Sequence, residues 1–530
     1  MSSKKTNIPP VNKPTAVPTA APAVSEQAKG TPAHCAPCPP TFTLDAPLRW
    51  KAANPLEQKV LLNLQGNILK GHGRDNTWNI FFQLGNDHLK SRRVLRDLGN
   101  HRITNAYKQL LESEAFKTEN KPGGTFCAVF ISAQGYKKLG IEFPAAAGND
   151  AFGQGMKHEE SRKALGDPPD SQWEPPFQQE LHGMVLIGDD DIARGSQAVA
   201  EVQAMFAGAG GTTHVQPGKA VRNAIGNGLE HFGYVDGRSQ PLMLLEDIEK
   251  EARDEGIAHW DPTFPLSTAL VQDPLAARPD PDATGPAPLS FGSFFIFRKL
   301  EQNVRGFKTH EQELADLLGM TGEDRERAGA AVVGRFEDGT PITMAGEARG
   351  IKDPRNDFDY AGDKDATRCP FHAHIRKTNP RGSGGFEKVD AERLHIMARR
   401  GITYEDTARV IHPEGLPAVD SKQEFIDQVQ GHLPESGVGL LFMAYNAKLD
   451  SQFVFTQRQW ANFAAFPKAP APPGLDGVIG QNANEPGGQV HAKEWDNPAA
   501  GSEPFNFKGF VTMKGGEYFF APSLTFLRDL

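Results

Sequence analysis

The chain has 530 residues, a formal net charge of −9 and a pI near 6.0. Hydrophobic residues make up 38% of it and charged residues 23%, which is typical of a globular protein, and the length favours more than one domain. A net acidic chain offers no basic surface for nucleic acid, so no nucleic-acid partner is expected. No run of eighteen apolar residues is present, so no membrane span is expected either.

Residues 1–50 are predicted to form a disordered tail. They are rich in proline and contain no aromatic residue before Phe42, so they cannot bury enough apolar surface to offset the entropy of ordering. Prolines and polar residues interrupt every apolar run near the start, which disfavours a signal peptide and predicts a cytoplasmic protein. Cys35 and Cys38 have CxxC spacing, but without a second pair they are a weak zinc signal, and two unligated thiols are the favoured interpretation.

From Leu61 onward, strands and helices are expected to alternate, which predicts an α/β or α+β domain over residues 51–261. Apolar runs and helical spacing define its elements. The expected strands cover 77–84, 125–132 and 182–189, and the expected helices cover 105–116 and 196–206.

A linker is expected at 262–290, where proline is frequent and apolar periodicity is lost, and a second domain at 291–530. The expected strands of this domain cover 291–300, 437–447, 452–460 and 516–524, and the expected helices cover 310–319 and 323–333. The two halves are similar in content but share no clear sequence repeat, so the sequence permits a duplicated fold without proving one.

The segment CPFHAHIRKTNPR, residues 369–381, combines two histidines with several cations. His372 and His374 would share a face only in an extended chain, so metal binding by both requires a strand here. A hydrolytic zinc site usually needs a third ligand, and no HExxH pattern is present. A single axial histidine is enough for haem, and the cations after it would suit the propionates. Judged alone, the segment favours a cationic loop over a cofactor site.

Two further segments carry candidate polar side chains. In HFGYVDGRSQP, residues 231–241, Gly233 and Gly237 flank Asp236 and would allow a tight turn to present its carboxylate; an ordinary Asp-Gly turn has the same pattern. In MARRGITYED, Arg399 and Arg400 follow an apolar run and precede a glycine. Locally, that pattern is typical of a helix C-terminus with matching cations and a glycine cap.

Taken together and in order, these segments resemble the dye-decolourising peroxidases, a family of haem enzymes, and in particular its longer-chain members. GYVDG matches the family's GxxDG motif, CPFHAHIRKTNPR resembles the segment of its proximal haem histidine, and ARRGITY resembles the segment of its distal arginine. Four further stretches extend the likeness from about residue 60 to the C-terminus: NLQGNILKGHGRD, SFFIFRKLEQ, GLLFMAYNAKLDSQFVFTQRQW and FVTMKGGEYFFAPSL.

The resemblance implies an α+β fold of two ferredoxin-like domains, each with an antiparallel sheet, and one haem b per chain held between sheet and helices. On the proximal side it implies that His374 is the iron ligand, with His372 only a neighbour. Arg381 would bind a propionate, and Asp450 would lie behind His374 as its carboxylate partner.

On the distal side the resemblance implies that Asp236 is the acid–base group and that Arg399 is the distal arginine, with Arg400 as the alternative. The implied activity uses hydrogen peroxide to oxidise bulky dye-like, aromatic or phenolic substrates in one-electron steps. The resemblance does not indicate an oligomeric state. Surface aromatic residues could relay electrons from substrates too large for a buried pocket. The candidates are Trp260, Tyr360, Tyr404 and Trp495.

Two alternatives remain open. A haem-binding or haem-handling protein with little peroxidase turnover would need His374 but neither Asp236 nor Arg399, so the presence of both favours the enzyme. A non-haem interaction protein on the same scaffold would need none of the three.

Overall fold

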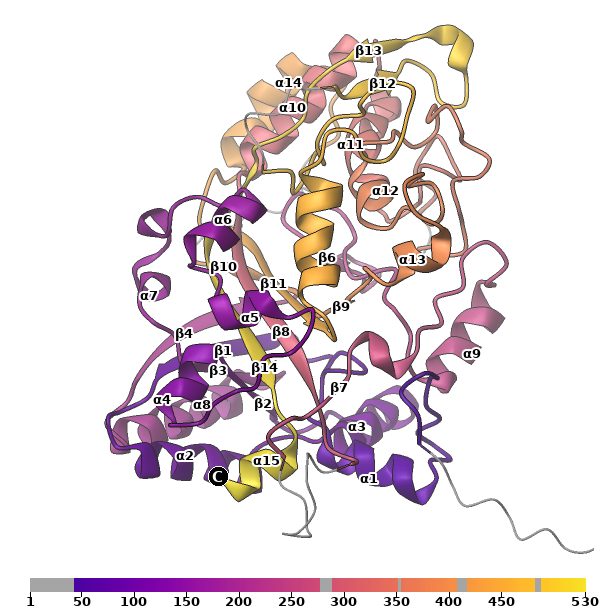
Figure 1. Ribbon diagram of the computed structural model, residues 1–530. Helices are drawn as coiled ribbons and strands as arrows, with labels where there is room; N and C mark the ends of the chain where they lie inside the picture. The colour runs from indigo at the N-terminus through magenta and orange to yellow at the C-terminus, as the bar shows by residue number, and fades with distance from the viewer. Residues whose placement is uncertain (1–41, 277–287, 351–353, 408–416, 482–487) are drawn as a thin grey trace, which may run out of the picture. The chain divides into compact units, whose positions relative to one another are not determined.

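The computed structural model describes residues 42–276, 288–350, 354–407, 417–481 and 488–530 (Figure 1). Cys35 and Cys38, with the predicted tail up to residue 41, lie outside these ranges. The predicted tail boundary at residue 50 is wrong, because Leu48 and Trp50 are buried and the Leu48 N–H donates to Met243 O over 2.9 Å. Apolar side chains between residues 42 and 50 therefore belong to the folded body.

One antiparallel sheet of ten strands organises this body. Its strand order is β10-β11-β8-β14-β2-β3-β1-β4, with β7 beside β8 and β9 beside β11. The strands in chain order are β1 (Asn76–Gln83), β2 (Phe126–Ile131), β3 (Gly183–Asp189), β4 (Thr212–Lys219), β7 (Val271–Gln272), β8 (Phe291–Gln302), β9 (Ala398–Arg399), β10 (Ile402–Glu405), β11 (Val438–Asn446) and β14 (Val511–Ala521).

The two halves of the sheet have the same topology. In the N-terminal half the strand order is β4-β1-β3-β2, and in the C-terminal half the main strands have the order β14-β8-β11-β10. Numbered within each half, both read 4-1-3-2, the order of a ferredoxin-like fold, so the predicted fold class is confirmed. A single residue pair, Phe520 with Ile131, joins the halves between β14 and β2.

Helices and short strands surround the sheet (Figure 1). The first half carries α1 (Pro55–Asn63), α2 (His88–His101), α3 (Ala106–Glu119), α4 (Ala133–Lys138), α5 (Asp150–Gln154), α6 (Glu159–Leu165), α7 (Pro175–Gln178), α8 (Ile192–Gly208), β5 (Val221–Arg222), β6 (Gly228–Leu229) and α9 (Leu245–Asp254). The second half carries α10 (Val304–Leu317), α11 (Glu326–Val333), α12 (His374–Thr378), α13 (Val389–Arg393), α14 (Lys422–Gln428), β12 (Val490–Ala492), β13 (Ser502–Pro504) and α15 (Leu524–Asp529).

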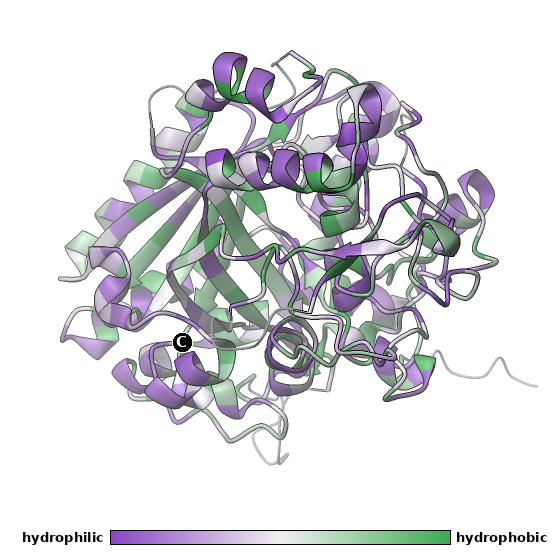
Figure 2. Cartoon of the chain, turned by 90° about the horizontal axis from the view of Figure 1, so that it is seen from above, coloured by the Kyte–Doolittle hydropathy of each residue, from purple (hydrophilic) through white to green (hydrophobic). Residues whose placement is uncertain are grey.

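Several helices begin where a short polar side chain accepts a backbone N–H of the first turn. Asp87, Asn105 and Asp191 do this for α2, α3 and α8. The strands are largely apolar and the outer helices mix apolar with hydrophilic residues (Figure 2), as expected when helices cover a sheet on one side and face water on the other.

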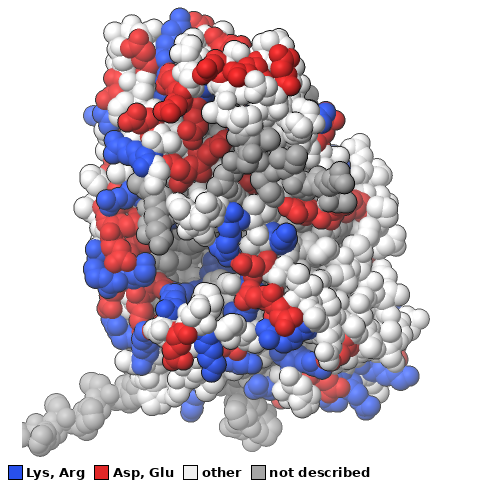
Figure 3. Space-filling model, turned by 180° about the vertical axis from the view of Figure 1, so that it is seen from behind, with Lys and Arg blue, Asp and Glu red and all other residues white. Residues whose placement is uncertain are grey.

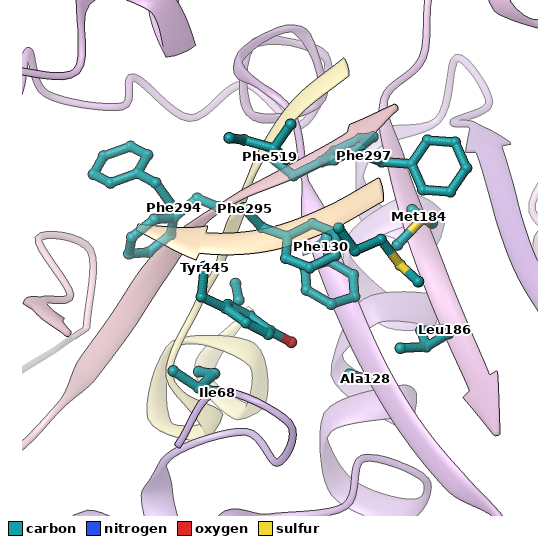
Figure 4. Close-up of a cluster of buried hydrophobic side chains, with 14 of the residues drawn as sticks. Ile68, Ala128, Phe130, Met184, Leu186, Phe294, Phe295, Phe297, Tyr445 and Phe519 are labelled. Carbon is teal, nitrogen blue, oxygen red and sulfur yellow. The ribbon is translucent and has the colours of Figure 1, made fainter. Parts of the chain in front are cut away.

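The phenylalanine-rich composition is explained by packing between the halves. Phe130 of β2 stacks on Phe295 of β8 with ring centroids 4.1 Å apart (Figure 4). Phe81 of β1 meets Phe297 of β8 with ring centroids 4.7 Å apart. Because these contacts cross from one half to the other, the halves share one core. The predicted linker accordingly contains β7, which pairs with β8, although residues 277–287 lie outside the description.

Two sequence-based interpretations are wrong. Residues 452–460, predicted as a strand, form the π-helical segments η6 (Asp450–Val454) and η7 (Thr456–Ala461). Their buried side chains, including Phe453, Gln457 and Trp460, recur every three to four residues, which is helical spacing. The helix C-terminus expected around Arg399 and Arg400 is not formed, because Arg399 ends β9 and Arg400 lies between β9 and β10.

Candidate active site

A cavity of about 550 Å³ is lined by residues from both halves of the fold. Strands β8 and β11, helix α12, the segments η6 and η7 and the loop after β6 all contribute side chains to its wall. Much of the lining is apolar, including Ile375, Ile396, Leu440, Phe442 and Phe453. Its volume suits a compact organic cofactor.

His374 lines this cavity from the first position of α12. Its Nδ1 lies 2.9 Å from Oδ2 of Asp476, whose side chain is fully buried. The other oxygen of Asp476 accepts the backbone N–H groups of Val478 and Ile479, at 2.8 and 2.9 Å. Burial raises the pKa of Asp476, but the charge and hydrogen bond of His374 and these N–H groups outweigh it, and the pKa is lowered. With Nδ1 occupied, Nε2 is the nitrogen left for a ligand.

The expectation that Asp450 lies behind His374 is wrong. Both Asp450 oxygens accept backbone N–H groups at the start of α5, from Asp150 at 2.8 Å and Ala151 at 3.1 Å. The sequence analysis did not identify Asp476. It lies in GLDGVIG, outside the stretches that resemble the peroxidase family, and the Asp-Gly pair was its only local signal.

His372 is buried away from the cavity lining. Its ring packs against that of His491 with centroids 4.5 Å apart, and its Nε2 has no hydrogen-bond partner among the described residues. Because α12 begins between the two histidines, His372 and His374 do not share the face that an extended chain would have given them.

Asp236 lines the same cavity from the GYVDG turn. Gly233 and Gly237 have φ angles of 102° and 80°, conformations that other L-residues rarely adopt. The turn is held from within by Glu230, whose carboxylate accepts the N–H of Phe232 at 2.8 Å and of Tyr234 at 2.9 Å. Burial raises the pKa of Glu230 to about 7. Sequence reasoning did not identify this second carboxylate.

Arg399 and Arg400 both reach the cavity wall but differ in how their donors are used. Arg400 donates to the carbonyls of Asn67, Ile68 and Arg399 over 2.7 to 2.9 Å, so its guanidinium is occupied by backbone. Arg399 donates from Nη2 to Arg238 O at 2.9 Å. Within the described ranges its guanidinium makes that one hydrogen bond, which leaves donors for a ligand.

Arg381 and Arg335 form a pair of buried cations in the same wall. Arg381 has a φ of 51°, rare for a side chain of its size, and donates to Asn356 O, Phe358 O and Ser239 Oγ over 2.6 to 2.7 Å. Burial, followed by repulsion from Arg381, lowers the pKa of Arg335 to about 9. Burial is also the main cause that lowers the pKa of Arg381 to about 10.

Neither arginine forms an ion pair with a carboxylate in the part of the chain that the structure describes. Two buried cations without an ion-paired carboxylate are expensive, so this place suits an anionic ligand. A haem presents one coordinating centre and two propionates, and His374 with Arg381 and Arg335 fits that group.

Of the four aromatic residues proposed as electron relays, Trp260, Tyr360 and Tyr404 are buried and Trp495 is partly buried. Each has a cation over its ring, between 4.6 and 5.3 Å from the centroid. The pairs are Trp260 with Arg381 and Arg393, Tyr360 with Arg376, Tyr404 with Lys299, and Trp495 with Arg368. A positive charge on a ring face favours the neutral ring over an oxidised one.

Known proteins are similar to this chain in sequence and fold. Residues 63–221 match the family model described as the DyP dimeric alpha+beta barrel domain. The multifunctional dye peroxidase DyP2 of Amycolatopsis sp. is 45% identical over 92% of this chain and 99% of its own. The chain belongs to the dye-decolourising peroxidase family. The dye-decolorizing peroxidase msp1 of Mycetinis scorodonius is 30% identical over 89% of this peroxidase and 87% of its own chain.

Solved structures agree with this assignment. The peroxidase superposes on the structure of Amycolatopsis DyP2 with a TM-score of 0.83 at 44% identity, covering 92% of this chain and all of that one. A DyP-type peroxidase of Anabaena sp. gives a TM-score of 0.79 at 36% identity, over 91% and 96% of the two chains. The protein is therefore a haem-dependent peroxidase.

Among the described residues no helix is long and apolar enough to cross a membrane. On the face shown in Figure 3, acidic and basic side chains are interspersed rather than gathered into one basic patch.

Proposed function

We propose that the peroxidase binds one haem b per chain in the cavity, with His374 Nε2 as the iron ligand and Arg381 and Arg335 on the propionates. The contact between His374 and buried Asp476 carries this proposal, because it fixes which ring nitrogen is free. The unpaired cations in the same cavity support it independently.

When bound, haem would supply the redox chemistry needed to react with peroxide. Asp476 holds His374 in one tautomer and makes its imidazole a stronger donor. Asp236 accepts a proton from one oxygen of the peroxide and donates it to the other oxygen, which leaves as water. Arg399, permanently cationic, stabilises the negative charge that grows on the separating oxygen. Arg400 positions Arg399 by anchoring the backbone around it.

The proposed reductants are bulky dyes and smaller phenols, oxidised one electron at a time. Several relatives are named as dye peroxidases, and a solved structure titled as a dye-decolorizing peroxidase complex with 2,6-dimethoxyphenol matches this chain with a TM-score of 0.66 at 28% identity. The cytoplasmic location stays a prediction.

Purified protein reconstituted with haem tests the proposal. We expect a Soret band and peroxide-dependent oxidation of both a bulky anthraquinone dye and a small phenol. Haem binding with no turnover on either substrate would favour the haem-handling alternative, and no haem binding would contradict the site.

A further inference from the structure

Lys377 lies on α12, three residues after His374, and is fully buried. Its Nζ donates to three backbone carbonyls, those of Phe463 at 3.0 Å, Phe466 at 2.6 Å and Gly474 at 2.7 Å. These bonds use all three donors of the ammonium group, and no carboxylate of the described ranges forms an ion pair with it. Burying a cation without such a partner is costly, so the contact with these carbonyls must have a structural purpose.

The three carbonyls belong to the loop that leads to Asp476. Residues 462–474 contain neither helix nor strand, so the chain there depends on side chains to fix its path. The N–H of Asp476 donates to Ala461 O at 3.0 Å, which closes the loop at its base. Lys377 therefore ties the inside of the loop together, and its last contact, with Gly474, comes two residues before Asp476.

The short helix α12 thus contacts Asp476 in two ways. Residues three apart on a helix lie on neighbouring parts of one face, so His374 and Lys377 reach the same loop. His374 bonds the Asp476 carboxylate directly, and Lys377 bonds the backbone just before it. Lys377 does not line the cavity, so it touches neither the cofactor site nor the place where peroxide would react.

The charge of Lys377 and its anchoring contacts act on His374 in opposite directions. Burial lowers the pKa of Lys377 to about 7, and the charge of Asp476 opposes that fall, so the two groups interact. As a cation, Lys377 weakens the pull of Asp476 on the His374 ring proton. As an anchor, it keeps Asp476 on His374. Because all three donors of Lys377 are used on carbonyls and none on Asp476, anchoring is the larger effect.

We propose that Lys377 is a positioning residue for the proximal pair. By holding the loop of residues 462–474 against α12, it keeps the Asp476 carboxylate hydrogen-bonded to His374, and so keeps the imidazole a strong donor to the iron. The inference rests on the haem site proposed above and adds a residue that acts only through Asp476.

Lys377→Met tests this, because methionine keeps the apolar stem but has neither charge nor donors. Haem-loaded protein is studied at pH 6, where Lys377 is charged. Resonance Raman spectroscopy of the ferrous protein measures the iron–histidine stretching frequency, and spectroelectrochemistry measures the reduction potential. We expect the frequency to fall and the potential to rise, as in Asp476→Asn.

Lys299→Met is the matched control. Lys299 is also buried, and its Nζ also has three partners, but none of them lines the cavity. The partners are Glu174, Gln216 and Asp406. Lys299→Met should lose stability, as Lys377→Met does, while both the frequency and the potential stay at the values of the unmodified protein.

A double variant separates positioning from a general loss of packing. In the Asp476→Asn background, Lys377→Met should change neither value further. The loop keeps one anchor in these variants, because Gln489 Nε2 donates to Leu475 O at 2.9 Å. If Lys377→Met still fails to hold haem, the same measurements are made on Lys377→Gln, which keeps an amide donor and should give smaller shifts in the same direction.

Three results would overturn the inference: unchanged values in both Lys377 variants, shifts of the opposite sign, which would mark an effect of charge, or shifts that persist in the Asp476→Asn background. Failure of the unmodified protein to bind haem, seen in the visible spectrum, would instead contradict the haem site.

Discussion

His374 Nδ1 lies 2.9 Å from Asp476 Oδ2, although the two residues are 102 positions apart in the chain. Because Asp476 is fully buried and is held by two backbone N–H groups, it cannot turn away from the histidine. The orientation of His374 is thereby set before any cofactor binds.

The two histidines of the CPFHAHIRKTNPR segment should differ sharply when replaced. His374→Ala removes the proposed iron ligand, so haem should be lost or bound weakly. His372→Ala should keep the Soret band, since His372 does not line the cavity. The ratio of Soret to protein absorbance after gel filtration measures both. The reverse pattern would show that the ligand has been assigned to the wrong histidine.

Asp476 and Asp450 provide a matched pair for the carboxylate behind the histidine. Asp476→Asn should weaken haem binding or activity by roughly 10–100-fold, the usual effect of removing a carboxylate that orients a ligand histidine, and should raise the reduction potential of the iron. Asp450→Asn changes only the start of α5 and should leave the potential unchanged. Potentiometric titration distinguishes the two; equal shifts in both variants would be inconsistent with the geometry.

The distal residues should slow the reaction with peroxide without releasing haem. Asp236→Asn should reduce that rate by roughly 10²–10⁴-fold, because it removes the proton acceptor. Arg399→Leu should reduce it by at least about 10²-fold through loss of charge stabilisation. Stopped-flow absorbance measures both rates. Unchanged rates in both variants would place the distal site elsewhere.

Arg400→Leu should behave differently from Arg399→Leu. It leaves the carbonyls of Asn67, Ile68 and Arg399 without their donors, so its main effect should be lower thermal stability. A loss of peroxide reactivity in Arg400→Leu alone, with full reactivity in Arg399→Leu, would reverse the assignment of the two arginines.

Glu230 should make stability depend on pH. Its pKa is raised to about 7, above its value in an unfolded chain, so the folded state binds more protons between about pH 4.5 and 7. The free energy of unfolding should therefore fall as pH rises through that window, by an amount on the order of 1–3 kcal/mol. Denaturant titrations at several pH values should show that the free energy of unfolding of Glu230→Gln falls less steeply with rising pH than that of the unmodified protein. The same pH dependence in both proteins would show that Glu230 is not the group responsible.

Removing the start of the chain should have two outcomes, depending on where the cut is made. Deletion of residues 1–40 should leave haem content and turnover unchanged, because that segment is too poor in apolar groups to support a core. Deletion of residues 1–50 also removes buried Leu48 and Trp50 and should lower the melting temperature markedly. Loss of haem in the shorter deletion would mean that the tail contributes to the fold.

The sequence by itself determined the features that depend on neighbours in the chain. Alternating and continuous apolar runs identified β1, β2, β3, β8 and β11, and paired glycines identified the turn that presents Asp236. It also indicated the family, because the motifs occur along the chain in the order that the family has. It failed at residues 452–460, because two aromatic residues spaced by two fit a strand as well as a π-helical turn.

Only the tertiary structure decided which partners the site residues have. Asp476 replaces Asp450 behind His374, and Arg400 rather than Arg399 is occupied by carbonyls. Such contacts depend on how the shared sheet brings distant segments to one cavity. Local propensity contains no information about that approach, because a carboxylate looks the same in the sequence whether it caps a helix or orients a histidine.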